Sequence, residues 1–285
     1  MKIKMIILAI LIYSNMCIAQ NEQLDVKTII NIPVIFHVIN SGKTSTINSD
    51  GRNINENLPT SLLLLELKDL HQDFMLKNED TLQVIPHYKS LISSANVNFF
   101  LADTILQANG EKGIIRVYNR NNRRNLHRKS KVISPDKFLN VYIGNTGSFT
   151  PSSPWLFPEK DAVFLSYAWV GQNYRLLTHE VGHWLGLFHL WGNGGGKGDK
   201  NSCSIGDGIA DTPEQYEATE PNGDCLTCPS LGSGIDKTCD KTNHKPSNFN
   251  NFMDYSGCRR MFTKGQVVKL RMTIKDNRKR LWKSY

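Results

Sequence analysis

The stretch THEVGHWLGLFH, residues 178–189, places three histidines and one glutamate within twelve positions. On a helix, His179 and His183 lie one turn apart on the same face, so both imidazoles can reach one ion. Glu180 projects about 100° around the helix from His179, close enough to contact water beside that ion without binding the ion itself. The spacing therefore predicts a helix that carries part of a metal site.

Two later residues complete the pattern. A positive φ at Gly186 would end the helix and turn the chain, so that His189 supplies a third ligand. Three histidines leave the fourth position of a tetrahedral zinc ion to water, which is typical of catalytic zinc. An amphipathic core helix is the alternative interpretation; it explains the leucines of the stretch but not three histidines and a glutamate at ligand spacing. The remaining histidines are scattered and are expected to be structural or exposed: His37, His71, His87, His127 and His244.

The composition is that of a globular protein, with 285 residues of which 40% are hydrophobic and 21% charged. The length allows one large domain or two small ones, and no apolar run in the body is long enough to span a membrane. We therefore expect no stable membrane insertion. The sequence does not set the oligomeric state, and a monomer is favoured.

The N-terminus differs from the body. Two lysines precede an apolar run over residues 5–13, and a small residue follows at Ala19. This pattern predicts a signal peptide over 1–19, cut after Ala19, and then a short N-terminal segment over 20–28. Lipid anchoring at Cys17 is the less favoured alternative, because the preceding three residues form a poor lipobox. The mature protein is therefore expected to be secreted.

The net charge of +8 permits nucleic-acid binding as one interpretation. The densest basic stretch, residues 116–131, is rich in asparagine and lacks periodicity, which favours a solvated loop. We therefore expect no nucleic-acid partner.

All five cysteines of the body lie in the last third of the chain: Cys203, Cys225, Cys228, Cys239 and Cys258. In an oxidising compartment they predict two disulfides and one odd thiol. The Cys225-x-x-Cys228 spacing could instead indicate a zinc ribbon or a redox motif, but no second Cys-x-x-Cys accompanies it.

Apolar patterning predicts strands over 28–39, 96–103, 135–145 and 161–169, and helices over 61–78, 174–187 and 263–282. Residues 190–250 show little periodicity and are rich in Gly, Asp, Asn and Pro, so they need disulfides or bound ions to stay compact. The first half is thus expected to be a mixed sheet with helices, and the second half loops with one helix.

The complete histidine motif resembles that of the metzincin zinc endopeptidases, which also carry a methionine turn beneath the metal. Here NFMDYSGC, residues 251–258, is similar to that turn, with Met253 as its packing methionine. Within the metzincins, the closer resemblance is to the pappalysin family. It extends to the stretches CSIGDGIADTP, MFTKGQ, INIPVIFHVI and SPDKFLNVYI, and it covers most of residues 29–270.

The resemblance implies an α+β, metzincin-like fold. A mixed twisted sheet with backing and active-site helices would lie above a loop-rich lower subdomain that ends in a C-terminal helix. One metalloprotease catalytic domain would span 29–285, with an upper subdomain over about 29–188 and a lower one over about 189–285.

The resemblance also implies a secreted zinc endopeptidase that hydrolyses peptide bonds in protein or peptide substrates. His179, His183 and His189 would bind one catalytic zinc ion. Glu180 would act as general base and acid toward the zinc-bound water, and Tyr255 would stabilise the tetrahedral intermediate.

Pappalysins bind structural calcium beside the site, and by position Asp207 and Thr212 would contribute to it, with Asp211 nearby. A simple Asp-Gly turn is the alternative interpretation of this segment. The disulfides that the family implies are Cys203–Cys239 and Cys228–Cys258, with Cys225 left over.

Two features depart from the pattern of relatives. No cysteine lies between residues 20 and 202, so a propeptide cysteine that blocks the zinc is not visible. Arginine-selective relatives carry acidic residues between the turn tyrosine and the next cysteine, whereas here Ser256-Gly257 fills that interval and Arg259-Arg260 follows. We therefore expect neutral or acidic side chains, rather than arginine, after the scissile bond.

Two other functions stay open. An exported zinc-binding adhesion or toxin-like module could keep the protease fold with little turnover, although the intact Glu180 and Tyr255 argue against it. A cytosolic zinc peptidase with reduced cysteines would require that the N-terminus is not a signal.

Overall fold

The computed structural model describes residues 26–49, 51–105, 107, 110–119, 126–146, 161–192, 202–219, 228, 236–239 and 246–283. The expected signal peptide, Cys17 and Cys225 lie outside these residues. Among the helices that the structure describes, none is long and apolar enough to cross a membrane.

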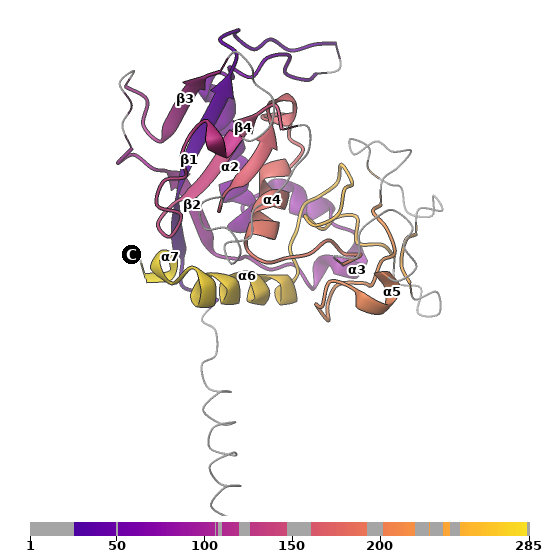
Figure 1. The fold of residues 1–285 in the computed structure, drawn as a ribbon. Helices are drawn as coiled ribbons and strands as arrows, with labels where there is room; N and C mark the ends of the chain where they lie inside the picture. The colour runs from indigo at the N-terminus through magenta and orange to yellow at the C-terminus, as the bar shows by residue number, and fades with distance from the viewer. Residues whose placement is uncertain are drawn as a thin grey trace, which may run out of the picture.

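A five-stranded sheet forms the upper part of the molecule (Figure 1). Its strands are β1 (Ile30–Asn40), β2 (Val97–Leu101), β3 (Ile114–Tyr118), β4 (Leu139–Gly144) and β5 (Val163–Ser166). Strand β1 pairs along one edge first with β2 and then with β3, and along its other edge with β4, which in turn pairs with β5. Every one of these pairings is parallel, where the sequence predicted a mixed sheet.

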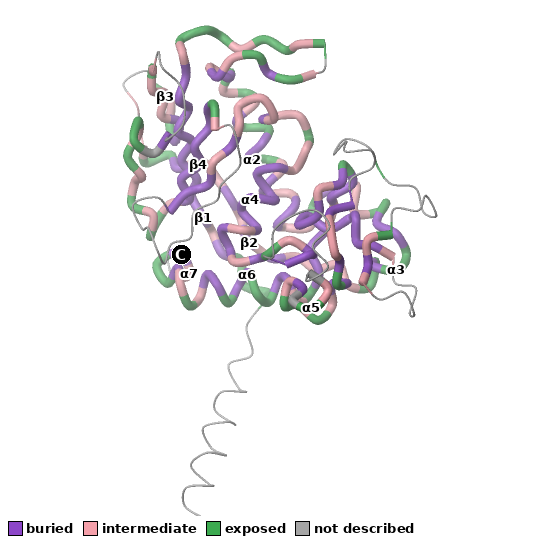
Figure 2. Tube along the Cα trace, turned by 45° about the vertical axis from the view of Figure 1, so that its right-hand side comes forward, coloured by how far each residue is buried: buried purple, intermediate pink, exposed green. Residues whose placement is uncertain are grey.

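The central strands are buried on both faces, as a covered parallel sheet requires. Figure 2 shows β1, β4 and α4 (Leu176–Trp184) as largely buried. Helix α2 (Thr60–Phe74) packs against β2 and α4, and α4 packs against β5. A smaller apolar cluster that includes Ile39, Leu126 and Tyr142 also packs against the sheet.

The remaining helices are short, except for one near the C-terminus. They are α3 (Pro86–Lys89), α5 (Ser202–Ile205), α6 (Lys264–Asn277) and α7 (Lys279–Lys283), with 3-10 turns η1 (Glu79–Gln83), η2 (Leu126–Arg128) and η4 (Tyr167–Trp169). Helix α6 begins at a capping box, in which the Thr263 hydroxyl accepts from the Gln266 amide and the Gln266 side chain accepts from the Thr263 amide. Figure 1 shows α6 and α7 along the lower side of the molecule.

The main core joins both halves of the chain. It contains Phe36 of β1, Leu63 of α2 and Val181 of α4 together with Phe252 and Leu270 from the last third. The last third of the chain is therefore anchored to the sheet and to helices α2 and α4 by shared apolar burial.

The α+β, metzincin-like fold expected from the sequence is confirmed by the architecture and by the structural relatives described below. The prediction of a solvated loop over 116–131 was wrong at its start, because residues 114–118 form β3. Arg116 in that strand pairs with Glu111 and donates to the Leu58 carbonyl oxygen, 58 residues away in the chain. Such long-range partners leave no trace in local periodicity.

Several predicted elements were too long, three of them for reasons that the structure shows. Helix α2 ends at Phe74, and the chain turns at Leu76, which has a φ of 53°. Strand β5 stops at Ser166 and continues as the η4 turn. The predicted helix over 263–282 is broken at Arg278 (φ −125°, ψ 47°), whose side chain turns inward to a buried carboxylate, Asp161.

Candidate active site

Helix α4, which carries the histidine motif, begins two residues later than predicted because its N-terminus is held by helix α2. The Glu66 carboxylate accepts hydrogen bonds from the Leu177 amide at 3.3 Å and from the Gly171 amide at 2.8 Å. The Thr178 hydroxyl donates to Asp73 at 2.6 Å. Two carboxylates thus satisfy donors at the positive end of α4.

Arg175 immediately precedes the helix in a left-handed conformation, with φ 54° and ψ 31°. Its guanidinium lies 3.3 Å from Asp69, 3.4 Å from Asp73 and 3.4 Å from Asp80. Burial raises the pKa of Asp73 to about 8, while the positive charge of Arg175 acts to lower it. The ion pairs hold the strained entrance of the helix in place.

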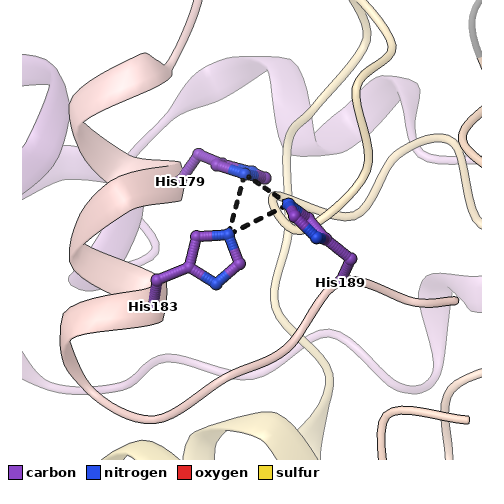
Figure 3. Close-up of side chains that lie close together, drawn as sticks. All are labelled: His179, His183 and His189. Carbon is purple, nitrogen blue, oxygen red and sulfur yellow. Dashed lines mark hydrogen bonds between the residues drawn. The ribbon is translucent and has the colours of Figure 1, made fainter. Parts of the chain in front are cut away.

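The three histidines of the motif converge on one point (Figure 3). The Nε2 atom of His179 lies 3.1 Å from Nε2 of His183 and 3.3 Å from Nε2 of His189, and the last two are 3.0 Å apart. In a tetrahedral zinc site with Zn–N of about 2.0–2.1 Å, ligand nitrogens are separated by about 3.3–3.4 Å. The spacing therefore fits a small tetrahedral cation.

The tautomers support the same conclusion. Nδ1 of His179 lies 2.7 Å from the Phe252 carbonyl oxygen, and Nδ1 of His183 lies 2.8 Å from the Leu187 carbonyl oxygen. Carbonyl oxygens only accept, so both Nδ1 atoms carry protons and both Nε2 atoms present lone pairs to each other. Burial lowers the pKa of His179 and His183, and that of His189 to about 3, so the rings stay neutral. Converging lone pairs are stabilised by a cation, and this donor set suits zinc.

Gly186 makes the turn that delivers the third histidine. It has a φ of +88°, its amide donates to the His183 carbonyl oxygen at 2.9 Å, and the next amide, of Leu187, donates to the Gly182 carbonyl oxygen at 3.0 Å. A Cβ at Gly186 would lie 2.7 Å from the Thr273 hydroxyl oxygen of α6. Both the backbone conformation and the contact with α6 therefore require glycine here.

Met253 packs beneath the helix at Gly182, the first glycine of the stretch 178–189. A Cβ at Gly182 would lie 2.5 Å from the Met253 sulfur, which is fully buried. The Asn251 side-chain oxygen accepts from the Met253 amide at 2.9 Å. The methionine turn thus contacts α4 opposite a residue with no side chain, which lets the two segments approach closely.

Glu180 and Tyr255 flank the histidines. Glu180 is 3% exposed, and its Oε2 has no hydrogen-bond partner among the described residues. Burial raises its pKa to about 8, and the charge of Arg259 lowers it. The Tyr255 hydroxyl lies 2.9 Å from Nε2 of His189. A phenol therefore lies beside the point where the imidazoles meet, and a buried carboxylate, one oxygen of which has no partner within the described part of the chain, follows the first histidine in the helix.

One contributor, Trp191, was missed from the sequence, and a second, Arg259, was noted there only as a basic neighbour of the methionine turn. The Trp191 ring stacks on His189 with centroids 4.5 Å apart and planes 8° from parallel, and it also contacts the Tyr255 ring at 4.9 Å. The Arg259 guanidinium donates to the Tyr174 carbonyl oxygen and acts electrostatically on Glu180 and His179. Trp191 lies two residues beyond the motif, but nothing in its spacing signals the stacking.

The residues expected to bind calcium lie together. The Thr212 hydroxyl is 2.7 and 2.9 Å from the two Asp207 oxygens, and the Ile209 amide donates to the same carboxylate at 3.0 Å. Asp211 is used elsewhere, since it accepts from the Thr263 hydroxyl and the Gly265 amide at the start of α6. Within the described residues, the group of three or more His, Cys, Asp or Glu side chains close enough to share an ion is the histidine triad.

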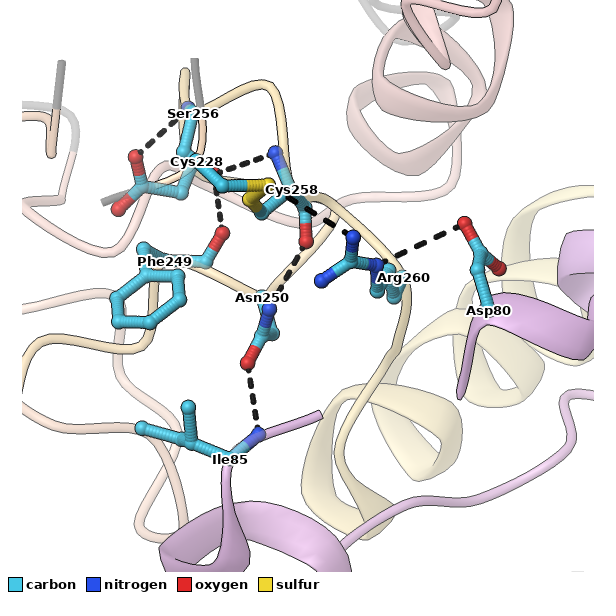
Figure 4. The surroundings of a disulfide bond; sticks show 9 residues. Asp80, Ile85, Cys228, Phe249, Asn250, Ser256, Cys258 and Arg260 are labelled. Atoms are coloured by element: carbon cyan, nitrogen blue, oxygen red, sulfur yellow. Dashed lines mark hydrogen bonds and ion pairs between the residues drawn. A yellow bond between two sulfur atoms is a disulfide. The ribbon is translucent and has the colours of Figure 1, made fainter. Parts of the chain in front are cut away.

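Two disulfides close the loop-rich segment. They join Cys203 to Cys239 and Cys228 to Cys258, the pairs that the family resemblance implies. Around the second bridge, Nδ2 of the Asn250 side chain donates to the Cys258 carbonyl oxygen at 3.0 Å, and the Ile85 backbone amide donates to the Asn250 side-chain oxygen at 3.0 Å (Figure 4). The Asn250 side chain thereby connects the methionine-turn segment beside the bridge to the chain before α3.

The fold and the site share the features of the metzincin class. These are a parallel sheet backed by a helix with His-Glu-x-x-His, a third histidine after a glycine turn, and a methionine turn below. The sequence profile of the Peptidase_M43 family, described as pregnancy-associated plasma protein-A, matches residues 123–275, just over half of the chain. The chain therefore belongs to this family of peptidases, the pappalysins.

Individual relatives agree with this membership. The chain is 38% identical over 100 residues to an extracellular metalloprotease of Arthroderma otae, covering 34% of this chain and 30% of that protein. It is 37% identical over 103 residues to extracellular metalloprotease 1 of Coccidioides posadasii, covering 34% of this chain and 29% of that protein. The matched part thus spans about a third of these relatives.

Solved structures are similar over nearly the whole chain. Mirolysin in complex with compound 9 superimposes with a TM-score of 0.69 at 29% identity, covering 90% of this chain and 96% of that one. Mature mirolysin of Tannerella forsythia in complex with a cleaved peptide gives a TM-score of 0.66 at 27% identity, covering 90% and 98%.

Proposed function

We propose that this protein is a secreted zinc-dependent endopeptidase that hydrolyses peptide bonds in proteins or peptides. The observation that carries the proposal is the convergence of three Nε2 atoms within 3.3 Å of one another beside Glu180. Family membership and the similarity to mirolysin support the same reaction class.

His179, His183 and His189 would hold the metal. Bound zinc would lower the pKa of water from 15.7 toward about 7 and polarise the scissile carbonyl. Glu180 lies one residue from the first ligand and has a carboxylate oxygen with no partner among the described residues. It is placed to accept a proton from the attacking water and to deliver it to the leaving amine.

Tyr255 would supply a second group at the centre, a hydrogen-bond donor. Its hydroxyl reaches Nε2 of His189 at 2.9 Å, and its ring is supported by Trp191. A phenol there can donate a hydrogen bond to the oxyanion that develops on the scissile carbonyl, which is the interaction that lowers the barrier most in acyl transfer.

The test compares casein cleavage by the wild type, Glu180→Ala and Glu79→Ala, the last being a matched control at an exposed glutamate. We expect Glu180→Ala to lower kcat at least about 100-fold with the zinc content unchanged, and Glu79→Ala to leave both unchanged. Undiminished cleavage by Glu180→Ala would remove the mechanism. Zinc binding without any wild-type turnover would instead favour the adhesion or toxin-like module.

We propose neutral or acidic side chains after the scissile bond. The supporting observation is that Arg259, which is buried, brings a positive charge near Glu180 and His179. A cation near the reacting groups disfavours a second cation from the substrate. Cleavage-site profiling on a peptide library tests this, and strong enrichment of Arg or Lys after the cut would contradict it.

We propose that Asp207 and Thr212 take part in a structural calcium site, because their oxygens are hard ligands that already lie together in a glycine-containing turn. Calcium should then raise the melting temperature of the wild type and not that of Asp207→Asn. An equal response of the two proteins to calcium, or none in the wild type, would refute the site.

We also propose export by a signal peptide over 1–19, followed by a segment over 20–28 and a single catalytic domain over 29–285. The disulfides and the extracellular relatives support export. N-terminal sequencing of the protein from culture medium should begin at Gln20. Recovery only in the cytosol with an intact N-terminus would favour a cytosolic peptidase.

A further inference from the structure

Asp254 lies between Met253 and Tyr255 and is 0% exposed. Its Oδ1 accepts from three backbone amides: Tyr255 at 2.6 Å, Thr219 at 3.0 Å and Ser256 at 3.2 Å. Its Oδ2 accepts from the Thr219 hydroxyl at 2.9 Å and from Gln215 Nε2 at 3.1 Å. One carboxylate thus gathers five neutral donors from two separate segments of the chain.

The donors require a group that only accepts. The Gln215 side chain is oriented by its own oxygen, which accepts from the Asn248 amide at 2.8 Å, so its NH2 group points toward Asp254. An asparagine at 254 would turn an NH2 group toward Gln215 Nε2 or toward the amides around Oδ1. Two donors would then face each other in a buried site, which is costly. The buried site at residue 254 therefore requires the carboxylate of aspartate, and asparagine, which has the same shape, would not satisfy its donors.

The same carboxylate sets the backbone from which Tyr255 projects. The bonds to the Tyr255 and Ser256 amides fold the turn around Asp254, and the Asp254 amide donates to the Asn251 carbonyl oxygen at 3.0 Å. The bonds to Gln215 and Thr219 tie this turn to a segment without regular secondary structure. With the backbone held, only two side-chain torsions decide where the Tyr255 hydroxyl lies.

We propose that Asp254 is a positioning residue that holds the Tyr255 hydroxyl beside the three histidines. It acts through the Tyr255 and Ser256 amides and through the anchor at Gln215 and Thr219. This inference rests on the role proposed above for Tyr255 in peptide hydrolysis.

The kinetic test is a double-mutant cycle on a quenched fluorescent peptide, with wild type, Asp254→Asn, Tyr255→Phe and the double variant. We expect Asp254→Asn to lower kcat by about 10- to 100-fold with KM changed by less than about threefold, since small displacements of a reacting group cost this much. In the Tyr255→Phe background the same substitution should lower kcat by less than about threefold. An equal loss in both backgrounds, or a wild-type kcat in Asp254→Asn, would overturn the proposal.

A milder pair of variants covers the case in which Asp254→Asn does not fold. Thr219→Val removes the hydroxyl donor to Oδ2 and keeps the carboxylate, whereas Thr81→Val removes a hydroxyl bonded to the Asn78 carbonyl oxygen away from this turn. We expect a several-fold loss of kcat for Thr219→Val that disappears in the Tyr255→Phe background, and none for Thr81→Val. A loss that persists in that background contradicts the proposal.

Crystal structures provide a readout that does not depend on turnover. In Asp254→Asn, or in Thr219→Val where that is the folded variant, the Tyr255 oxygen should move away from Nε2 of His189, to which it lies 2.9 Å in the native protein. An unchanged distance would refute the positioning role. If the wild type proves unable to cleave peptides, the proposed function fails while this distance still decides the inference about Asp254.

Discussion

His37 provides a test of the fold through the pH dependence of stability. The residue lies in β1 and is fully buried, with its ring stacked on Tyr142 at 4.3 Å between centroids. Its Nε2 lies 2.9 Å from the Asn140 side-chain oxygen, and its Nδ1 lies 2.7 Å from the Ser130 hydroxyl. The Asn140 oxygen accepts, so Nε2 carries the proton and Nδ1 accepts from Ser130. One neutral tautomer satisfies every polar atom of the ring.

Burial lowers the pKa of His37 from 6.5 to about 4, with the Asn140 hydrogen bond acting in the opposite direction. Between these values the unfolded chain binds a proton that the native protein excludes. The contribution of His37 to stability is therefore present above pH 6.5 and is lost as the pH falls toward 4. A difference of about 2.5 in pKa corresponds to about 3 kcal/mol, of which about 2.5 kcal/mol is lost between about pH 7.5 and 4.5.

The assay is urea unfolding of the wild type and His37→Gln at a series of pH values. Glutamine can donate to Asn140 and accept from Ser130 but does not titrate. The difference in unfolding free energy between the two proteins should therefore shift by about 2.5 kcal/mol in favour of the variant as the pH falls from about 7.5 to 4.5. Titration of other groups cancels in this difference.

His87→Gln is the control, because His87 is exposed. A difference for His37→Gln that stays constant within about 0.5 kcal/mol would refute the assignment of His37 as a buried neutral histidine.

Three further predictions concern packing and metal. Gly182→Ala should destabilise the protein by about 1–3 kcal/mol in urea unfolding, because the new Cβ would lie 2.5 Å from the Met253 sulfur. The double variant Gly182→Ala/Met253→Ala should lose less unfolding free energy than the sum of the two single variants. Strict additivity would contradict the contact. Arg278→Met should lower the free energy of unfolding by about 3–5 kcal/mol, because it leaves the Asp161 carboxylate buried without its bidentate partner. Adding Asp161→Asn to this variant should recover part of the loss. An absence of recovery would contradict the pairing. Removal of zinc by a chelator should lower the melting temperature by several degrees, reversibly on adding zinc, and an unchanged melting temperature would argue against a bound metal at the histidines.

Much of the site could be predicted because its spacing is local. His179 and His183 face the same way on any helix, and Gly186 tolerates the positive φ that brings His189 back. The limits of α4 could not be predicted, since its start depends on Glu66, 111 residues away from Leu177 in the chain. A helix whose N-terminal donors are satisfied by another helix shows no capping residue of its own.

In the sheet, too, one strand was predicted from the sequence and another was missed. The pattern of β1 is strong because the strand is buried on both faces, and it was recognised within two residues at its start. Strand β3 was missed because its five residues are mostly half-buried and carry Arg116, whose partners lie 5 and 58 residues away. A short strand at the edge of a sheet can be recognised only once the strand that it pairs with is known.

By itself the sequence predicted the ligand set, the general base and the reaction class, because these predictions rest on residue types at fixed spacings along one helix and turn. Tertiary structure alone decided where Tyr255, Trp191 and Arg259 stand around the histidines. It also decided how Asp254 gathers its donors and why Gly182 must lack a side chain above Met253. These features arise from contacts between segments far apart in the chain, and the distances that set their energies exist only once the chain is folded.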